Sequence, residues 1–272
     1  MSKPKLNDIE RVFPAKFTAS ILDALEDELR TRLPNSGMDD VILDIFGGVG
    51  GVHKLADRFM GLTTVAVELE REFADNHERT VCGDSSNLGR SELLQQAVAA
   101  ITGGRRPNAI VTSPAYGNRL ADQYLGSDDE KCRRCMGNGQ AITSEPDGPP
   151  CPQCDGSGKA KSTRKGYAIA KGERLSDGSG AALFFGDAYK ALHHRIISGV
   201  AEYVEPGTLW LVNVSSFIAD KKYVPAMEWW VGEMALHTEI IGLRAVPTPR
   251  SREGANHEAR VDAEHIIIAR TI

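Results

Sequence analysis

The chain has 272 residues, of which 41% are hydrophobic and 25% charged, the proportions of an ordinary soluble globular protein. This length suits one sizeable α/β domain with an insertion, or two small domains. No apolar stretch approaches the roughly 18 residues of a membrane span. No apolar run follows the N-terminal residues, so a secretory signal is not expected either. The sequence therefore predicts a cytoplasmic protein.

The charge is unevenly distributed along the chain. The formal net charge of −5 at first argues against a nucleic-acid partner. Between Lys131 and Arg174, however, nine Lys or Arg stand against four Asp or Glu, a balance of +5, which leaves about −10 for the rest. Such segregation is compatible with a basic face on an acidic body, although a merely solvated segment has the same composition.

Helical periodicity and short apolar runs alternate along most of the chain. The first part predicts helices over 18–33, through 55–59 and over 91–101, and strands over 41–46, 63–69, 80–84 and 108–112. The last part predicts helices near 187–204 and through 227–230, and strands over 208–214, 239–246 and 263–270. This order predicts an α/β fold with a mixed, mainly parallel sheet that helices cover on both faces.

A polar segment rich in Gly, Ser, Lys and Arg interrupts this alternation from about Gly117 to about Gly186. We interpret it as an insertion that holds four of the five cysteines. The predicted division is a first α/β part with an N-terminal helix over 1–126, an insertion over 127–175, and a second α/β part over 176–272.

A glycine-rich turn follows the first predicted strand, in the sequence Asp44-Ile45-Phe46-Gly47-Gly48-Val49-Gly50-Gly51. Glycines let the backbone approach an adenosine-type cofactor, because a Cβ would collide with it. Glu68 ends the second strand, where a carboxylate accepts both ribose hydroxyls, and Asp84 ends the third, where it receives the adenine amino group. Acids at strand ends are more often helix caps, but three on successive strands mark the ligand-binding edge of an open sheet.

The glycine-rich turn resembles the first motif of the amino-methylating DNA methyltransferases. In that motif an acid, an aromatic residue and then glycines surround the methionine moiety of S-adenosylmethionine. The resemblance implies a Rossmann-like class I methyltransferase fold and a cofactor site built from Asp44, Phe46, Gly47, Gly48, Gly50, Glu68 and Asp84.

The segment directly after the fourth strand reads Thr112-Ser113-Pro114-Ala115-Tyr116-Gly117-Asn118-Arg119. It resembles the catalytic motif of the same family, in which Ser, Asp or Asn precedes two prolines and an aromatic residue. An exocyclic amine is a poor nucleophile, and hydrogen-bond acceptors on its N–H groups favour its reactive pyramidal form. The resemblance implies that Ser113 Oγ and a carbonyl near Pro114 are these acceptors. It also implies that Tyr116 stacks on a base flipped out of the duplex.

Ala115 stands where the second proline of the family is usual. Alanine leaves the backbone freer than proline does, and its N–H needs a partner, so we expect a less rigid loop. Tetrapeptides of this kind are usually ordinary turns. Here the position after a strand, downstream of the glycine-rich turn, favours a catalytic role.

The resemblance continues through 189–195 and 205–214, and through a loop over 248–260 that is similar to one in phage and bacterial DNA methylases. The mechanism needs no histidine base, so His193 and His194 are expected to pack or to face solvent. The implied partner is nucleic acid, most of all double-stranded DNA. Contacts with it, largely to phosphates, are predicted for Asn118, Arg119, Arg133, Arg134, Lys161, Arg164, Lys165, Arg250, Arg252 and Arg260.

Two C-x-x-C pairs, Cys132 with Cys135 and Cys151 with Cys154, are separated by fifteen residues. This spacing predicts a structural four-cysteine zinc site. Each pair continues as C-x-x-C-x-G-x-G, which resembles the zinc-binding units of DnaJ-type chaperones. The insertion is either a DNA-contacting arm or a long loop ordered by the metal. Cys82, the fifth cysteine, is expected to be a small buried residue in a strand.

Three alternatives remain open at this point. Two of them are RNA and a free base as the substrate, because the same chemistry serves any exocyclic amine. The third is a degenerate methyltransferase scaffold that acts as a zinc-dependent nucleic-acid-binding module, and only Ala115 favours it. Cytosine-C5 methylation is disfavoured, because it needs a cysteine nucleophile in a Pro-Cys loop. The residues do not decide between N4 of cytosine and N6 of adenine.

Overall fold

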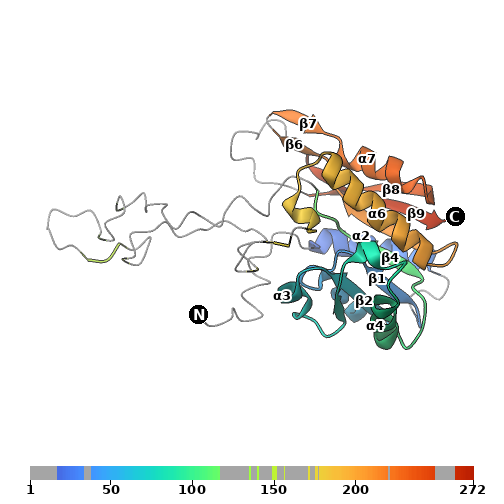
Figure 1. The fold of residues 1–272 in the computed structure, drawn as a ribbon. Helices are drawn as coiled ribbons and strands as arrows, with labels where there is room; N and C mark the ends of the chain where they lie inside the picture. The colour runs from blue at the N-terminus through green and yellow to red at the C-terminus, as the bar shows by residue number, and fades with distance from the viewer. Residues whose placement is uncertain are drawn as a thin grey trace. The chain divides into compact units, whose positions relative to one another are not determined.

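The computed structural model describes most of the α/β part of the chain and isolated residues elsewhere. The described residues are 17–33, 38–116, 135, 140, 149–151, 156, 171, 175–176, 178–219, 221–248 and 261–272. The chain divides into two compact units, Ala15–Arg119 with Leu175–Ile272, and Met1–Pro14 with Leu120–Arg174. The larger unit contains the helices and strands labelled in Figure 1.

A seven-stranded mixed sheet in the order β3-β2-β1-β4-β5-β9-β8 forms the centre of this unit. The first five strands of that order are parallel, and β9 runs antiparallel to both β5 and β8. Their bounds are β1 Val41–Asp44, β2 Thr63–Glu68, β3 Thr80–Cys82, β4 Ala109–Thr112, β5 Leu209–Val214, β8 Thr238–Pro247 and β9 Ala263–Thr271. The predicted α/β fold is confirmed: a mixed, mainly parallel, Rossmann-like sheet with helices on both faces.

Helices cover both faces of the sheet, because successive strand residues point to opposite faces. In β1, Val41 and Leu43 belong to one core cluster and Ile42 to the other. The first cluster includes α4 (Glu92–Thr102), α6 (Asp187–Tyr203) and α7 (Ala226–Met234), of which α6 lies along the sheet in Figure 1. The second includes α2 (Ala19–Arg32) and the 3₁₀ helix η1 (Gly51–Arg58).

The helix boundaries follow from capping residues in the sequence. Thr18 Oγ1 accepts a hydrogen bond from Ile21 N at 3.3 Å at the start of α2, and Ser91 Oγ accepts one from Leu94 N at 3.3 Å at the start of α4. Gly103, with φ 66°, ends α4 in a left-handed conformation that suits glycine. The helices predicted over 18–33 and 91–101 are therefore confirmed to within a residue or two.

The shortest elements differ from the sequence prediction or were missed. The helix predicted through 55–59 is of the 3₁₀ type and begins at Gly51, directly after Gly50 with φ 83°. The missed elements are too short to show periodicity: α3 Arg71–Ala74, η2 Ser85–Asn87, η3 Gly180–Ala182 and the hairpin of β6 Phe217–Ala219 with β7 Lys222–Val224.

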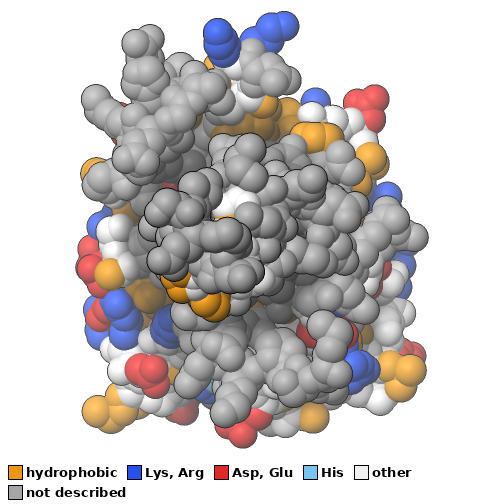
Figure 2. Space-filling model, turned by 90° about the vertical axis from the view of Figure 1, so that its left-hand side faces the viewer, with side chains coloured by type: hydrophobic (Ala, Val, Ile, Leu, Met, Phe, Trp, Pro, Cys, Tyr) orange, Lys and Arg blue, Asp and Glu red, His pale blue; other side chains and the backbone are white. Residues whose placement is uncertain are grey.

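The described surface carries both signs of charge. On the face shown in Figure 2, both Lys or Arg and Asp or Glu side chains lie around the edge. The basic segment predicted between 131 and 174 lies almost entirely outside the described residues. Within the described part of the chain, no helix has the length and apolarity to span a bilayer.

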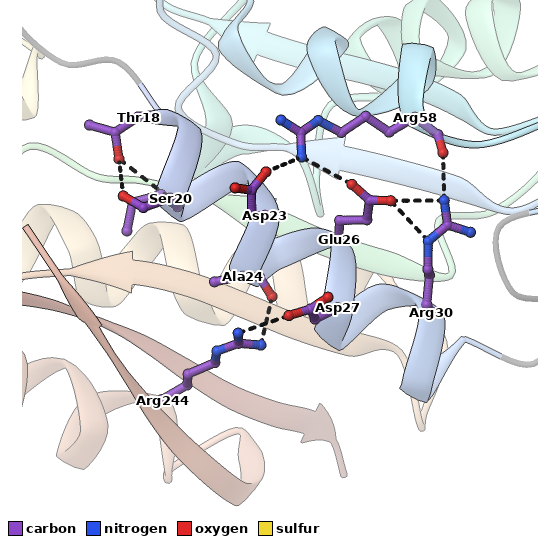
Figure 3. Close-up of polar contacts among 10 residues, drawn as sticks. Thr18, Ser20, Asp23, Ala24, Glu26, Asp27, Arg30, Arg58 and Arg244 are labelled. Carbon is purple, nitrogen blue, oxygen red and sulfur yellow. Dashed lines mark hydrogen bonds and ion pairs between the residues drawn. The ribbon is translucent and has the colours of Figure 1, made fainter.

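Helix α2 is held to the sheet by an apolar face and a rim of ion pairs. Leu25 and Leu29 on the apolar face of α2 are fully buried. At the rim, Arg58 Nη1 contacts Asp23 Oδ1 at 2.6 Å, and Arg244 Nη2 contacts Asp27 Oδ2 at 2.9 Å, as Figure 3 shows. Apolar burial contributes more than exposed ion pairs do, so the buried face supplies most of the attachment.

This ranking predicts unequal costs for two alanine substitutions on α2. Leu25→Ala should lower the free energy of unfolding by about 3 kcal/mol, because it leaves a cavity in the core. Asp27→Ala should lower it by less than about 1 kcal/mol, since the Asp27 side chain is 66% exposed. Equilibrium urea unfolding of both variants measures the difference, and equal costs would contradict the ranking.

Candidate cofactor and catalytic site

Asp44, the last residue of β1, joins the glycine-rich turn to β4. Its Oδ1 accepts hydrogen bonds from Phe46 N at 3.0 Å and from Thr112 Oγ1 at 2.6 Å. Burial raises the pKa of the Asp44 carboxyl to about 6, against the opposing effect of these two donors. Because the side chain is buried, the contacts that the structure gives Asp44 are internal ones that fix the turn against the end of β4.

The glycine-rich turn packs against β2 so closely that side chains are excluded. Gly47 N donates to Val67 O at 2.9 Å, and a Cβ added at Gly47 would lie 2.9 Å from Ala66 Cβ. Gly50 adopts φ 83°, which L-residues with side chains rarely adopt. These glycines are therefore required by the turn itself.

Glu68, at the end of β2, receives two backbone N–H groups. Gly48 N donates to Oε2 at 2.7 Å, and Glu70 N donates to Oε1 at 2.9 Å. Burial raises the pKa of the Glu68 carboxyl to about 7, although both donors oppose this rise, and the negative charges of Glu70 and Asp44 add to it. Each carboxylate oxygen has two lone pairs, so Glu68 can still accept further hydrogen bonds.

Asp84 follows β3 and caps a short helix. Its Oδ1 accepts from Ser86 N at 2.9 Å, and its Oδ2 accepts from Asn87 Nδ2 at 3.3 Å. The helix-cap interpretation thus holds for this residue. Asp84 also lines a pocket of about 260 Å³, together with Val81 from β3, the adjoining Gly83, and Leu94 from α4.

His53 is a site residue that the sequence did not single out. It lies on η1, and its ring nitrogens pair with Thr64 Oγ1 at 2.9 Å and Thr80 Oγ1 at 3.0 Å. Its ring stacks on His77 at a centroid distance of 3.7 Å. Burial is the main cause that lowers the pKa of His53 to about 3, so the ring is neutral and ties η1 to β2 and β3.

The segment after β4 is held from two neighbouring strands. Asn213 Nδ2 on β5 lies within hydrogen-bond distance of Ser113 Oγ (3.3 Å), Tyr116 Oη (3.2 Å) and Glu264 Oε2 (2.8 Å), and its two N–H groups are shared among these three acceptors. Tyr116 Oη itself donates to Glu264 Oε2 on β9 at 2.8 Å. Ser113 and Tyr116 are therefore fixed relative to each other through one amide and one carboxylate, neither of which the sequence indicated.

A second clamp on this segment comes from α6 and α7. Tyr189 Oη donates to Ala115 O at 2.6 Å and accepts from Trp230 Nε1 at 3.0 Å. The Ala115 N–H makes no hydrogen bond to any described residue. Tyr189 therefore anchors the backbone of the segment at the position where the second proline of the family is usual.

The two adjacent histidines of α6 occupy different environments. His193 is fully buried, and its Nδ1 donates to Tyr189 O at 2.8 Å. Burial lowers its pKa to about 4, and its ring lies 5.4 Å from Phe46, centroid to centroid. The His194 side chain is 52% exposed. As expected, one histidine packs and the other faces solvent.

Glu70 connects β2 to the chain that returns from the predicted insertion. This buried carboxylate accepts from Ser176 N at 2.7 Å and from Ser176 Oγ at 2.9 Å. No motif or periodicity indicated this contact, since the two residues are 106 positions apart. Residue 176 therefore lies next to the strand end that carries Glu68.

Several predicted residues lie outside the described part of the chain. They are Asn118, Arg119, Cys132, Arg133, Arg134, Cys154, Lys161, Arg164, Lys165, Arg250, Arg252 and Arg260. Of the paired cysteines, Cys135 and Cys151 are described, and both are buried in contact with each other. Cys82 lies in β3 as predicted but is only half-buried.

No family model and no curated protein matches the chain. Solved structures of similar fold include TrmN from Thermus thermophilus, at 11% identity over 93% of this chain and 48% of that one, with a TM-score of 0.44. They also include the N-methyltransferase NodS from Bradyrhizobium japonicum in complex with S-adenosyl-L-homocysteine (8% identity, 98% and 97% coverage, TM-score 0.42). A third is the PH0226 protein from Pyrococcus horikoshii, at 10% identity over 96% of this chain and 97% of that one, with a TM-score of 0.48. The chain spans about half the length of TrmN, and these likenesses concern the fold alone.

The raised pKa of Glu68 predicts a pH-dependent stability difference. A carboxyl whose pKa is higher in the folded state stabilises the protein below its unfolded pKa, and this contribution is lost as pH rises through about 7. Relative to wild type, Glu68→Gln should therefore gain about 2 kcal/mol in free energy of unfolding between pH 5 and pH 8.

Urea unfolding without ligand at both pH values measures this difference. The comparison with wild type is needed because the lowered pKa values of His53 and His193 act in the opposite direction. Glu92→Gln, on the exposed first turn of α4, is the matched control. A Glu68→Gln difference that does not change with pH would contradict the burial argument.

Proposed function

We propose that this chain transfers a methyl group from S-adenosylmethionine to an exocyclic amino group of a base in DNA, at N4 of cytosine or N6 of adenine. One observation carries the proposal. The hydrogen bond of 2.6 Å from Thr112 Oγ1 to Asp44 Oδ1 joins the glycine-rich turn to the residue directly before Ser113. Two motifs that lie 68 residues apart in the sequence therefore share one edge of the sheet, the edge at which open α/β sheets bind ligands.

The residues at this edge fit the cofactor. S-adenosylmethionine supplies an electrophilic methyl group when bound. The turn at Gly47 and Gly50 holds its backbone close to the end of β2, and Glu68 at that strand end retains lone pairs for ribose hydroxyls. The pocket beside Asp84, at about 260 Å³, is smaller than the roughly 300–1,000 Å³ of whole-ligand pockets, which suits a single heterocycle.

Ser113 and its neighbours fit the amine. Asn213 Nδ2 occupies one acceptor site of Ser113 Oγ, which leaves the other lone pair for an N–H of the target base. The hydrogen bond to Glu264 fixes the hydroxyl end of Tyr116, so its ring has a defined plane for stacking. Acceptors that are fixed before the reaction favour the pyramidal amine without reorganisation in the transition state.

The choice of DNA as substrate rests on the sequence. The basic residues of the insertion and of the loop over 248–260 supply phosphate contacts, which position a duplex without reading its sequence. Ala115, the one feature that favoured a degenerate scaffold, loses weight because its carbonyl is held by Tyr189. RNA remains the alternative substrate of the same chemistry.

We also propose that Cys132, Cys135, Cys151 and Cys154 hold a structural zinc ion. Burial of Cys135 against Cys151 supports this, because it brings together one cysteine from each C-x-x-C pair. A closed four-thiolate site leaves no position open for substrate, so the metal orders the insertion and takes no part in methyl transfer.

Ser113→Ala tests the proposed reaction. The variant should lose roughly 100-fold or more in kcat, because the amine loses an acceptor, while its affinity for S-adenosylhomocysteine should stay unchanged. Incorporation of labelled methyl into unmethylated plasmid and into RNA, followed by mass spectrometry of the nucleosides, measures transfer and identifies the base. Calorimetric titration with S-adenosylhomocysteine is the control for cofactor binding. Label in RNA alone would replace the substrate, and no label anywhere despite cofactor binding would contradict catalysis.

Tyr189→Phe tests the clamp on the catalytic segment. Without its hydroxyl, the Ala115 carbonyl loses its donor and the segment shifts, so kcat should fall roughly 10- to 100-fold at unchanged cofactor affinity. Tyr223→Phe is the matched control, because it also removes a hydroxyl: Tyr223 is an exposed residue of β7 whose hydroxyl contacts Glu228 on α7. Equal activity of the two variants would show that the clamp does not position Ser113.

A further inference from the structure

Two histidines and a glutamate gather where α6 packs against the end of α7. His194 lies on α6, Glu233 is the penultimate residue of α7, and His237 lies in the turn before β8. His194 Nδ1 and Glu233 Oε1 are 2.6 Å apart, and one possible ligand atom from each of the three residues lies within 4.8 Å of the others. The rings of His194 and His237 are 6.1 Å apart, centroid to centroid.

His237 contributes a nitrogen that the protein leaves unsatisfied. Its Nε2 is buried, and no hydrogen-bond partner for it exists among the described residues. Buried polar atoms in folded proteins are nearly always paired, and the exceptions call for an unseen water or ion. The contact between His194 and Glu233 gives a hydrogen-bond partner to two members of the cluster, but it does not account for the buried Nε2 of His237.

We propose that His194, Glu233 and His237 bind a divalent transition-metal ion of the Zn²⁺ type, at a site separate from the four cysteines. Two imidazole nitrogens and one carboxylate oxygen form a donor set that Zn²⁺ accepts at about 2.0–2.2 Å. Such ligands lie a little over 3 Å apart around a tetrahedral ion.

The exposure of the three residues defines the kind of site. The Glu233 side chain is 12% exposed and His237 is half-buried, whereas His194 is 52% exposed, so the cluster opens to solvent on the α6 side. Three protein ligands leave the fourth position of a tetrahedral ion to water. A metal here connects α6 to α7, the two helices that the hydrogen bond from Trp230 Nε1 to Tyr189 Oη also joins. The inference does not depend on the proposed methyl transfer.

Cobalt distinguishes this site from the cysteine site. We would strip the full-length protein of metal, titrate it with Co²⁺ and follow both calorimetry and the visible spectrum. Thiolate ligands add an intense charge-transfer band in the near ultraviolet, which nitrogen and oxygen ligands lack. Wild type should therefore show one titration step, of one Co²⁺ per chain, that adds d–d bands without increasing this charge-transfer band. Any Co²⁺ bound by the cysteines appears as a separate step in which the charge-transfer band grows.

Two glutamate variants assign the ion to the cluster. Glu233→Gln should weaken this binding event at least 10-fold, because it removes the anionic ligand. Glu239→Gln, an exposed residue at the start of β8, should leave it unchanged. Absence of the nitrogen- and oxygen-ligated Co²⁺ in wild type would overturn the proposal even without the variants. Equal binding by wild type and Glu233→Gln would do the same.

Discussion

The candidate site depends on a single buried carboxylate. Asp44 accepts from Phe46 N and from Thr112 Oγ1, and so fixes the glycine-rich turn after β1 to the end of β4. Burial of that carboxyl is unfavourable for its charge, as the rise of its pKa to about 6 shows. Folded proteins keep such groups where a fixed geometry is needed, and perturbed carboxyls concentrate at functional sites. Both candidate motifs start from the strand ends that Asp44 connects.

The segment from Ser113 to Tyr116 is then held by groups from four other elements. Asn213 on β5 and Glu264 on β9 fix its side chains, while Tyr189 on α6, itself held by Trp230 on α7, fixes its backbone. These contacts explain how the loop dispenses with a second proline. Proline restricts φ within the chain, whereas here packed helices and strands supply the restriction from outside.

The sequence predicted what local physics determines. Alternating apolar residues set β1 between two helical layers, and Thr18 and Ser91 mark helix starts through their side-chain oxygens. The strand-end acids could also be located, since the carboxyl edge of a parallel sheet follows from strand order.

The contacts that complete the site could not be predicted in this way. Tyr116 meets Glu264 across 148 residues, and Glu70 meets Ser176 across 106. No periodicity or motif relates residues so far apart, because only the folded sheet brings them together. His53 and the cluster of His194, Glu233 and His237 were missed for the same reason, and the basic residues of the insertion lie outside the described residues.

A crystal structure of the protein with S-adenosylhomocysteine tests most directly whether the two motifs form one site. The account predicts the ribose hydroxyls on the Glu68 carboxylate, the amino acid moiety over the turn at Gly47 to Gly50, and the sulfur facing Ser113. A ligand bound elsewhere, or bound at the turn with its sulfur directed away from Ser113, would contradict it.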